Sequence, residues 1–96
     1  MARLRIRFKF FGQFRELVGQ GEVGVDVTPG AGLQEALKEL IGRYPLLEGK
    51  ILDTDGRLGP HAIAFVNGCN TRTMRQPSPA LVDGDTVLLT QAIAGG

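Results

Sequence analysis

The chain has 96 residues, of which 43% are hydrophobic and 22% are charged, and its formal net charge at pH 7 is +1. This length predicts one domain with a core large enough to fold without disulfides or a metal. The near-neutral charge excludes a bulk electrostatic attraction to nucleic acid or to anionic membranes. The sequence has no apolar run for a membrane helix, no signal-peptide pattern and a single cysteine, so we expect a cytoplasmic protein.

The N-terminal region is typical of a β-hairpin. Residues 3–10 alternate between basic and apolar side chains, and residues 22–27 alternate between valines and acidic residues or glycine. A period of two indicates strands with one buried and one exposed face. In an antiparallel hairpin Glu22 and Asp26 face the arginines, and such pairs contribute about 0.2–1 kcal/mol each. We therefore interpret the basic stripe as a solvated sheet face, with an RNA-binding surface as the alternative.

Helical structure is expected in two places. The segment 11–19 is too short for a full helix and ends in glycine, so we expect a helical turn or wide loop that places Phe14 or Leu17 beneath the sheet. In residues 33–44 the apolar positions recur every three or four residues. This spacing predicts an amphipathic helix that ends before Pro45.

The second half of the chain predicts further strands joined by turns. The strand predictions rest on runs of apolar and β-branched residues, and the turn predictions rest on Asn-Gly and Asp-Gly pairs. The predicted segments are a long connection at 45–60 with a short strand or turn at 50–52, strands at 62–66 and 86–91, a short edge strand within 70–75, and turns at Asn67-Gly68 and Asp83-Gly84-Asp85.

These elements predict an α+β fold. One helix covers only one face of a mixed four- or five-stranded sheet, so the other face stays in contact with solvent. The first and last strands can lie side by side at the centre of the sheet, as in the β-grasp or ubiquitin-like architecture. We therefore expect a single β-grasp domain over residues 1–96 with a flexible C-terminal tail at 92–96, called the tail below.

Residue types that usually carry catalysis are few. The chain has one histidine, His61, one cysteine, Cys69, and no Cys/His cluster with metal-ligand spacing. Its glycines match neither the G-x-G-x-x-G nor the P-loop pattern. We therefore expect no bound cofactor, no metal and no enzymatic activity of its own. The last residues, Ala94-Gly95-Gly96, instead favour a group that is presented to another enzyme, because glycines are slim enough to enter a narrow cleft.

Four motifs in the chain occur together and span nearly its whole length. They are Phe10 to Gly19, Phe65-Val66-Asn67-Gly68, Asp83-Gly84-Asp85-Thr86-Val87 and Ala94-Gly95-Gly96. In this order they resemble the MoaD/ThiS-like sulfur carriers of the ubiquitin-like superfamily, which include the small subunit of molybdopterin synthase and ubiquitin-like small modifier proteins. The chain departs from that family at Gln91-Ala92, where members often carry prolines, and at Cys69, where they often carry a basic or polar residue.

The resemblance implies that the α-carboxylate of Gly96 is the reactive group. An ATP-dependent activating enzyme (MoeB/ThiF-like) adenylates it, and sulfur then displaces AMP to give a thiocarboxylate. The first function implied is that of a sulfur carrier, the small subunit of molybdopterin synthase in molybdenum cofactor biosynthesis, with a large MoaE-like subunit as partner. The alternatives are a modifier joined to protein lysines, a sulfur donor for tRNA thiolation or for another acceptor enzyme, and, more remotely, a β-grasp RNA- or protein-binding module.

Partner binding is expected at the tail and at the surface beside it. A five-residue tail spans at most about 17 Å, so the body of the domain must also contact the partner. Gly95 and Gly96 are expected to enter the partner's tunnel. The remaining candidate contacts are Phe11, Arg15, Leu89, Ile93 and Ala94. Three lysines, Lys9, Lys38 and Lys50, are candidate conjugation sites that the sequence does not rank.

Overall fold

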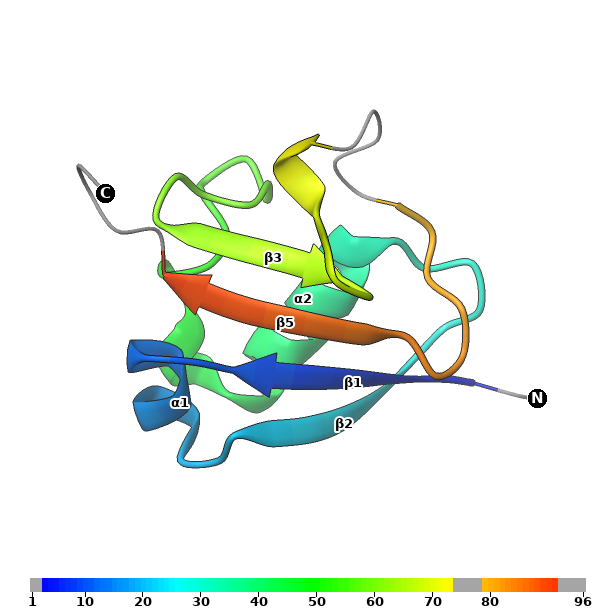
Figure 1. The fold of residues 1–96 in the computed structure, drawn as a ribbon, viewed down its shortest axis with the longest axis horizontal. Helices are drawn as coiled ribbons and strands as arrows, with labels where there is room; N and C mark the ends of the chain where they lie inside the picture. Colours follow the sequence, from blue (N-terminus) through cyan, green and yellow to red (C-terminus); the bar gives the residue numbers. More distant parts are fainter. Residues whose placement is uncertain (1–2, 74–78, 92–96) are drawn as a thin grey trace.

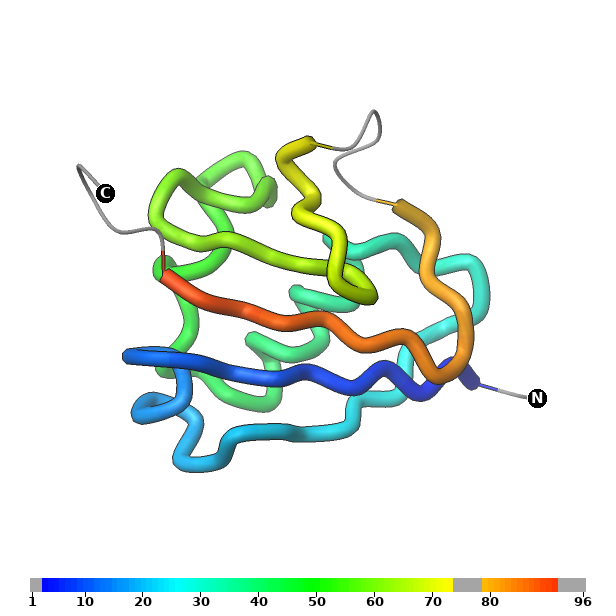
Figure 2. Tube along the Cα trace, in the orientation of Figure 1, coloured from blue at the N-terminus to red at the C-terminus, as the bar shows by residue number. Residues whose placement is uncertain are grey.

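The computed structural model of the chain describes residues 3–73 and 79–91, which form a mixed sheet with a long helix across one face (Figure 1). The elements are β1 (Leu4–Phe10), α1 (Gln13–Val18), β2 (Glu22–Val27), α2 (Leu33–Arg43), η1 (Pro45–Leu47), β3 (Ala62–Val66), β4 (Cys69–Asn70), η2 (Thr71–Thr73) and β5 (Thr86–Gln91). The sheet has five strands in the order β2-β1-β5-β3-β4. The first and last strands run parallel at its centre, as the tube in Figure 2 shows, and the other pairs are antiparallel. The predicted β-grasp, ubiquitin-like fold is therefore confirmed.

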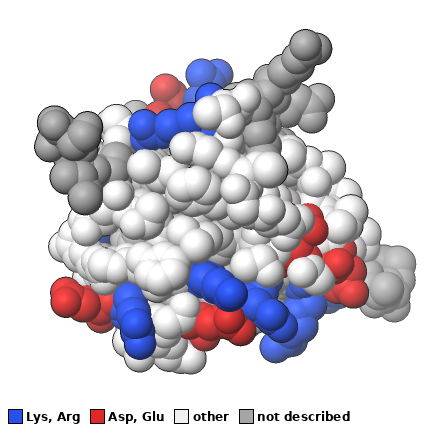
Figure 3. All heavy atoms as spheres, viewed as in Figure 1, with Lys and Arg blue, Asp and Glu red and all other residues white. Residues whose placement is uncertain are grey.

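The β1–β2 hairpin carries the charge pairs predicted from its alternation. Arg5 lies opposite Asp26, and the two side chains form an ion pair with an N···O distance of 3.4 Å. Arg7 pairs with Glu22 at 3.3 Å. Figure 3 shows Lys and Arg beside Asp and Glu along this part of the surface. All four side chains are exposed, so each pair contributes at most about 1 kcal/mol, and the basic stripe is partly neutralised.

The core lies between the sheet and α2. Side chains from alternate positions of β1, β2, β3 and β5 face the helix, whose buried side consists of Leu33, Ala36, Leu37 and Leu40. Phe14 of α1 closes one end of this core and is 2% exposed, while Leu17 packs against the core and is partly buried. The predicted helical turn with Phe14 or Leu17 beneath the sheet is thus confirmed, since both side chains contribute.

The predicted edge strand within residues 70–75 is confirmed at Asn70 and wrong for Thr71–Thr73, while residues 74 and 75 lie outside the described residues. The strand at the edge of the sheet is Cys69–Asn70, and the chain then enters the 3-10 helix η2. The Asn70 side chain explains the difference, because its Oδ1 accepts a hydrogen bond from the Arg72 N–H at 2.9 Å. The Thr73 hydroxyl donates to the Asn70 carbonyl oxygen at 2.8 Å. Such local side-chain bonds compete with a strand ladder and here favour a turn.

The other predicted elements fall at or near their expected positions. Strands at 22–27, 62–66 and 86–91 have the predicted bounds, and the helix expected at 33–44 ends at Arg43 with Tyr44 as its C-cap. In the long connection at 45–60, where we predicted a short strand or turn at 50–52, Leu52 forms an isolated β-bridge with Leu58. Across residues 3–73 and 79–91, none of the helices reaches the length and apolar character that crossing a membrane requires.

Candidate functional site

The candidate site surrounds the point where β5 ends. The strand ends at Gln91, between β1 on one side and β3 on the other, so the tail begins from the middle of the sheet. Four residues predicted to act in the tail lie outside the described residues, namely Ile93, Ala94, Gly95 and Gly96. The described part of the candidate site is therefore the surface around the end of β5.

Phe11 lies directly beside this point. It follows the last residue of β1, and its N–H donates to the Leu89 carbonyl oxygen at 3.0 Å. The residue is 49% exposed, which is unusual for a large apolar residue held next to a central strand. The prediction that Phe11 contacts a partner remains a prediction, and the position suits it because an exposed aromatic ring beside the tail adds apolar contact area.

Gly12 and Gln13 connect β1 to the end of β5. Gly12 has φ +60° and ψ −134°, a conformation that residues with a Cβ avoid, and it turns the chain from β1 into α1. The Gln91 side chain lies over Gly12, with its Oε1 3.5 Å from the place where a Cβ would be. The Nε2 of Gln91 donates a hydrogen bond to the Oε1 of Gln13. We call Phe11, Gly12, Gln13 and Gln91 the tail root.

Arg15, the predicted polar contact, lies in α1 one turn beyond the tail root. Its guanidinium packs over Gly21, where the Nε atom is 3.5 Å from the position of a Cβ. In the part of the chain that the structure describes, this guanidinium has no ion pair or side-chain hydrogen bond, and the residue is exposed. A carboxylate of a partner can therefore bind it without displacing an internal contact.

Leu89 is not a surface residue, so its prediction as a partner contact is wrong. Its side chain is fully buried and faces α2, together with Val87. Leu88 takes the opposite face of the sheet and is partly exposed. Adjacent leucines made the sequence ambiguous, because either direction of alternation buries one of them. The register of β5 against β1, in which Phe10 pairs with Leu89, decides which one.

Leu88 belongs to a shallow hollow of about 470 Å³ on the sheet face opposite α2. The hollow is lined by Lys9, Phe65, Asn67, Gly68, Thr86 and Leu88. Figure 3 shows this face with an uncharged band bordered by basic and acidic side chains. Apolar side chains with a polar border are typical of a protein-docking surface. We call these six residues the sheet-face hollow.

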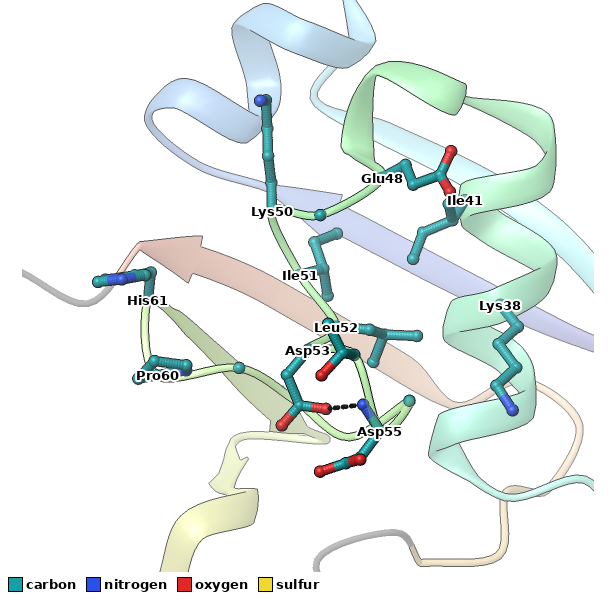
Figure 4. A pocket seen from close by; sticks show the side chains of 14 residues that line it. Lys38, Ile41, Glu48, Lys50, Ile51, Leu52, Asp53, Asp55, Pro60 and His61 are labelled. Carbon is teal, nitrogen blue, oxygen red and sulfur yellow. Dashed lines mark hydrogen bonds between the residues drawn. The ribbon is translucent and has the colours of Figure 1, made fainter.

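A larger hollow of about 820 Å³ lies between α2 and the connection at 48–61 (Figure 4). His61 is the only histidine that lines this hollow, and its side chain points away from the hollow in Figure 4. The Oδ1 of Asp53 accepts bonds from the backbone N–H groups of Asp55 at 2.9 Å and Arg57 at 3.0 Å, so this carboxylate shapes its own loop. Among the described residues no three His, Cys, Asp or Glu side chains are placed to hold a metal ion, and Cys69 is exposed in β4.

Sequence reasoning missed Gln13, Gln91 and Leu88. The two glutamines are 78 positions apart, and no local pattern indicates that their side chains meet. Leu88 could have been found only by fixing the register of β5. The residues that sequence and structure share at this site are Phe11 and Arg15.

Comparison with known proteins places this arrangement in a family. Residues 8–96 match the ThiS family, and the chain belongs to that family of ubiquitin-like proteins. Small archaeal modifier protein 3 of Haloferax volcanii is 32% identical over 93 residues, which cover 97% of this chain and 100% of the relative. Small archaeal modifier protein 1 of the same organism is 31% identical over 91 residues, with 95% and 100% covered.

Solved structures agree on the fold. The crystal structure of SAMP1 from Haloferax volcanii superposes with a TM-score of 0.81 at 30% identity, covering 96% of this chain and 99% of that one. The putative molybdopterin converting factor, subunit 1, from Pyrococcus furiosus superposes with a TM-score of 0.73 at 22% identity, covering 94% and 99%. The second likeness shows the shared β-grasp fold alone.

Proposed function

We propose that this chain is a ubiquitin-like protein modifier whose Gly96 carboxylate is joined to lysine amines of other proteins. The observation that carries this proposal is the full-length similarity, above 30% identity, to two small archaeal modifier proteins. We therefore place protein modification before molybdopterin synthesis as the proposed function. The relatives with the higher identity are named as modifier proteins, whereas the molybdopterin-related structure shares only the fold.

The chemistry requires activation by a partner enzyme, since a carboxylate is a poor electrophile. A Gly96 carboxylate oxygen attacks the α-phosphorus of ATP, and pyrophosphate leaves. The resulting mixed anhydride has AMP as a good leaving group. A lysine amine then attacks the carbonyl carbon, and an amide forms as AMP departs with loss of the amine proton. ATP therefore belongs to the activating enzyme, and the chain itself supplies the electrophile.

Docking to that enzyme is proposed to involve the tail root, Arg15 and the sheet-face hollow. All three lie on described parts of the domain, and Phe11 and Leu88 offer partly exposed apolar side chains. Ordering a tail on binding costs about 1–2 kcal/mol of backbone entropy per residue. Contacts made by the folded body must offset that cost, and this is why a surface beside the tail is needed.

Sulfur carriage is the second candidate function, and the ThiS family match favours it. The first step is the same, but sulfide attacks the carbonyl carbon of the anhydride, AMP leaves, and a thiocarboxylate remains on Gly96. If a protein persulfide attacks instead, the product is an acyl disulfide, and a second thiol must then form a disulfide with the persulfide's carrier cysteine to release the thiocarboxylate. A pterin precursor in a MoaE-like partner, a tRNA uridine or an activated amino acid then accepts the sulfur. One chain can serve both functions because they diverge only after adenylation.

Intact and tryptic mass spectrometry distinguish the two functions. The chain is incubated with ATP and the adenylating enzyme of the same organism, with and without a sulfur donor. Replacement of one oxygen by sulfur raises the mass by about 16 Da, as atomic masses require. Conjugation leaves a branched lysine, and because no Lys or Arg follows Arg75, trypsin leaves residues 76–96 on it.

The matched control is Gly96→Ala, which adds one methyl group at the reactive end. We expect its unfolding free energy to stay within about 0.5 kcal/mol of the unchanged chain, as for most surface changes. We expect both adducts to disappear. An unchanged yield of adducts with this variant would contradict the narrow-tunnel argument, and the absence of any adduct with the unchanged chain would contradict the proposed function.

A further inference from the structure

We infer that the hydrogen bond between the Gln91 and Gln13 side chains is a latch that fixes how β5 leaves the sheet and so positions the tail for the activating enzyme. The inference rests on the proposed function, since it assigns these two glutamines as positioning residues for adenylation of Gly96. Neither glutamine is required by the fold itself, because both side chains are exposed.

The need for a latch follows from the backbone at this point. The parallel register of β1 and β5 ends with Phe10 opposite Leu89, and the last backbone bond between these segments runs from the Phe11 N–H to the Leu89 carbonyl. Gly12 then turns β1 away. Gln91 still pairs with Ala62 of β3 on its other side. The last residue of β5 is therefore held by backbone pairing on one side only.

The Gln91 side chain supplies the connection on the other side. It crosses the face of Gly12, where the absence of a Cβ leaves room, and reaches the first residue of α1. That helix is a firm anchor because its next residue, Phe14, is 2% exposed in the core. The latch thus ties the end of a central strand to a helix that the core holds in place.

The expected effect on the enzyme follows from preorganisation. When the end of β5 samples several directions, only a fraction of molecules presents the tail correctly, and the apparent dissociation constant rises by the inverse of that fraction. A solvent-exposed amide–amide bond has a modest net strength. Its loss is expected to raise KM for this chain by about 2- to 10-fold and to leave kcat unchanged.

The test uses the full-length chain with Gln13→Met, Gln91→Met and the double variant. Methionine keeps a similar length and removes the amide. Gln13→Glu keeps the acceptor oxygen and is the conservative variant. Gln20→Met makes the same change at an exposed glutamine outside the tail root, and it is the matched control.

Three measurements are made on each variant: ¹⁵N relaxation of the Gln91 backbone amide, the midpoint of thermal unfolding, and KM and kcat for ATP–pyrophosphate exchange with the adenylating enzyme. We expect the two single Met variants and the double variant to lower the order parameter of the Gln91 amide equally and to raise KM equally. The midpoint should move little, Gln13→Glu should retain a KM near that of the unchanged chain, and Gln20→Met should change nothing.

Several outcomes overturn the latch. One is an unchanged relaxation of the Gln91 amide in Gln13→Met. Another is a rise in KM that is additive in the double variant, and a third is a rise in KM that Gln20→Met reproduces. If the unchanged chain itself is not adenylated, the proposed function fails and the positioning role fails with it. If that chain is adenylated normally and the Met variants match it, only the latch is refuted.

Discussion

Leu88 and Leu89 are neighbours in β5 that lie on opposite faces of the sheet, and replacing each by alanine separates folding from docking. Leu89 is fully buried between the sheet and α2. Leu88 is partly exposed in the sheet-face hollow. The two substitutions remove the same atoms from adjacent positions, so each variant is the control for the other.

The magnitude for Leu89→Ala comes from its burial. Truncation of a buried leucine costs about 2–5 kcal/mol, from lost transfer free energy and the cavity that remains. A domain of this length loses roughly 4–8 °C in its unfolding midpoint for each kcal/mol. We therefore expect the midpoint to fall on the order of 10–30 °C, which is a large share of the whole stability of a small domain.

Leu88→Ala is expected to act mainly on binding. A partly exposed leucine contributes less to folding, so we expect a cost of about 1 kcal/mol or less. Removal of an apolar anchor from a docking surface costs about 1–2 kcal/mol of binding free energy. KM for the adenylating enzyme should then rise by about 5- to 30-fold.

The assays are thermal unfolding by circular dichroism and pyrophosphate exchange at a temperature at which both variants are folded. An equal loss of stability in the two variants would refute the assignment of Leu88 and Leu89 to opposite faces. A normal KM in Leu88→Ala would refute the sheet-face hollow as a docking surface and leave the fold assignment intact.

Four further changes test how the domain is held together. Gly12→Ala should lower the unfolding free energy by about 1–3 kcal/mol, since φ +60° and ψ −134° are strained for alanine. Gly24→Ala should change the unfolding free energy by less than about 0.5 kcal/mol, because the new Cβ meets only the movable end of the Arg5 side chain, 2.8 Å away. Chemical denaturation measures both values. Arg72→Met should cost about 1–2 kcal/mol, since one guanidinium nitrogen of Arg72 donates to three carbonyls, those of Gly59 at 3.3 Å, Pro60 at 3.0 Å and Ala62 at 3.0 Å. Limited proteolysis should then cut the connection at 48–61 faster, and an unchanged cleavage rate would contradict this role. A higher salt concentration should weaken the ion pairs that Arg5 and Arg7 form with Asp26 and Glu22, and it should change the unfolding free energy by no more than about 1 kcal/mol. Unfolding midpoints measured over a series of salt concentrations check this.

The alternation in residues 22–27 and the three-to-four spacing in 33–44 were sufficient to predict a hairpin and an amphipathic helix. Side-chain periodicity is a local property, and it reports which face of an element is buried without any knowledge of its neighbours. The same local chemistry predicted the Asn67-Gly68 turn, where both residues have positive φ. The predicted edge strand does not extend over Thr71–Thr73, because side-chain hydrogen bonds of Asn70 and Thr73 turn the chain there, and β-propensity does not count such bonds.

The sequence by itself determined the fold class, the two-faced sheet and the membership in a family whose motifs are local and ordered along the chain. Only the tertiary structure decided that Leu89 is core and Leu88 is surface, because that choice depends on the register of β5 against β1. It alone brought Gln13 to Gln91, since a contact across 78 positions forms only when the first and last strands pair at the centre of the sheet.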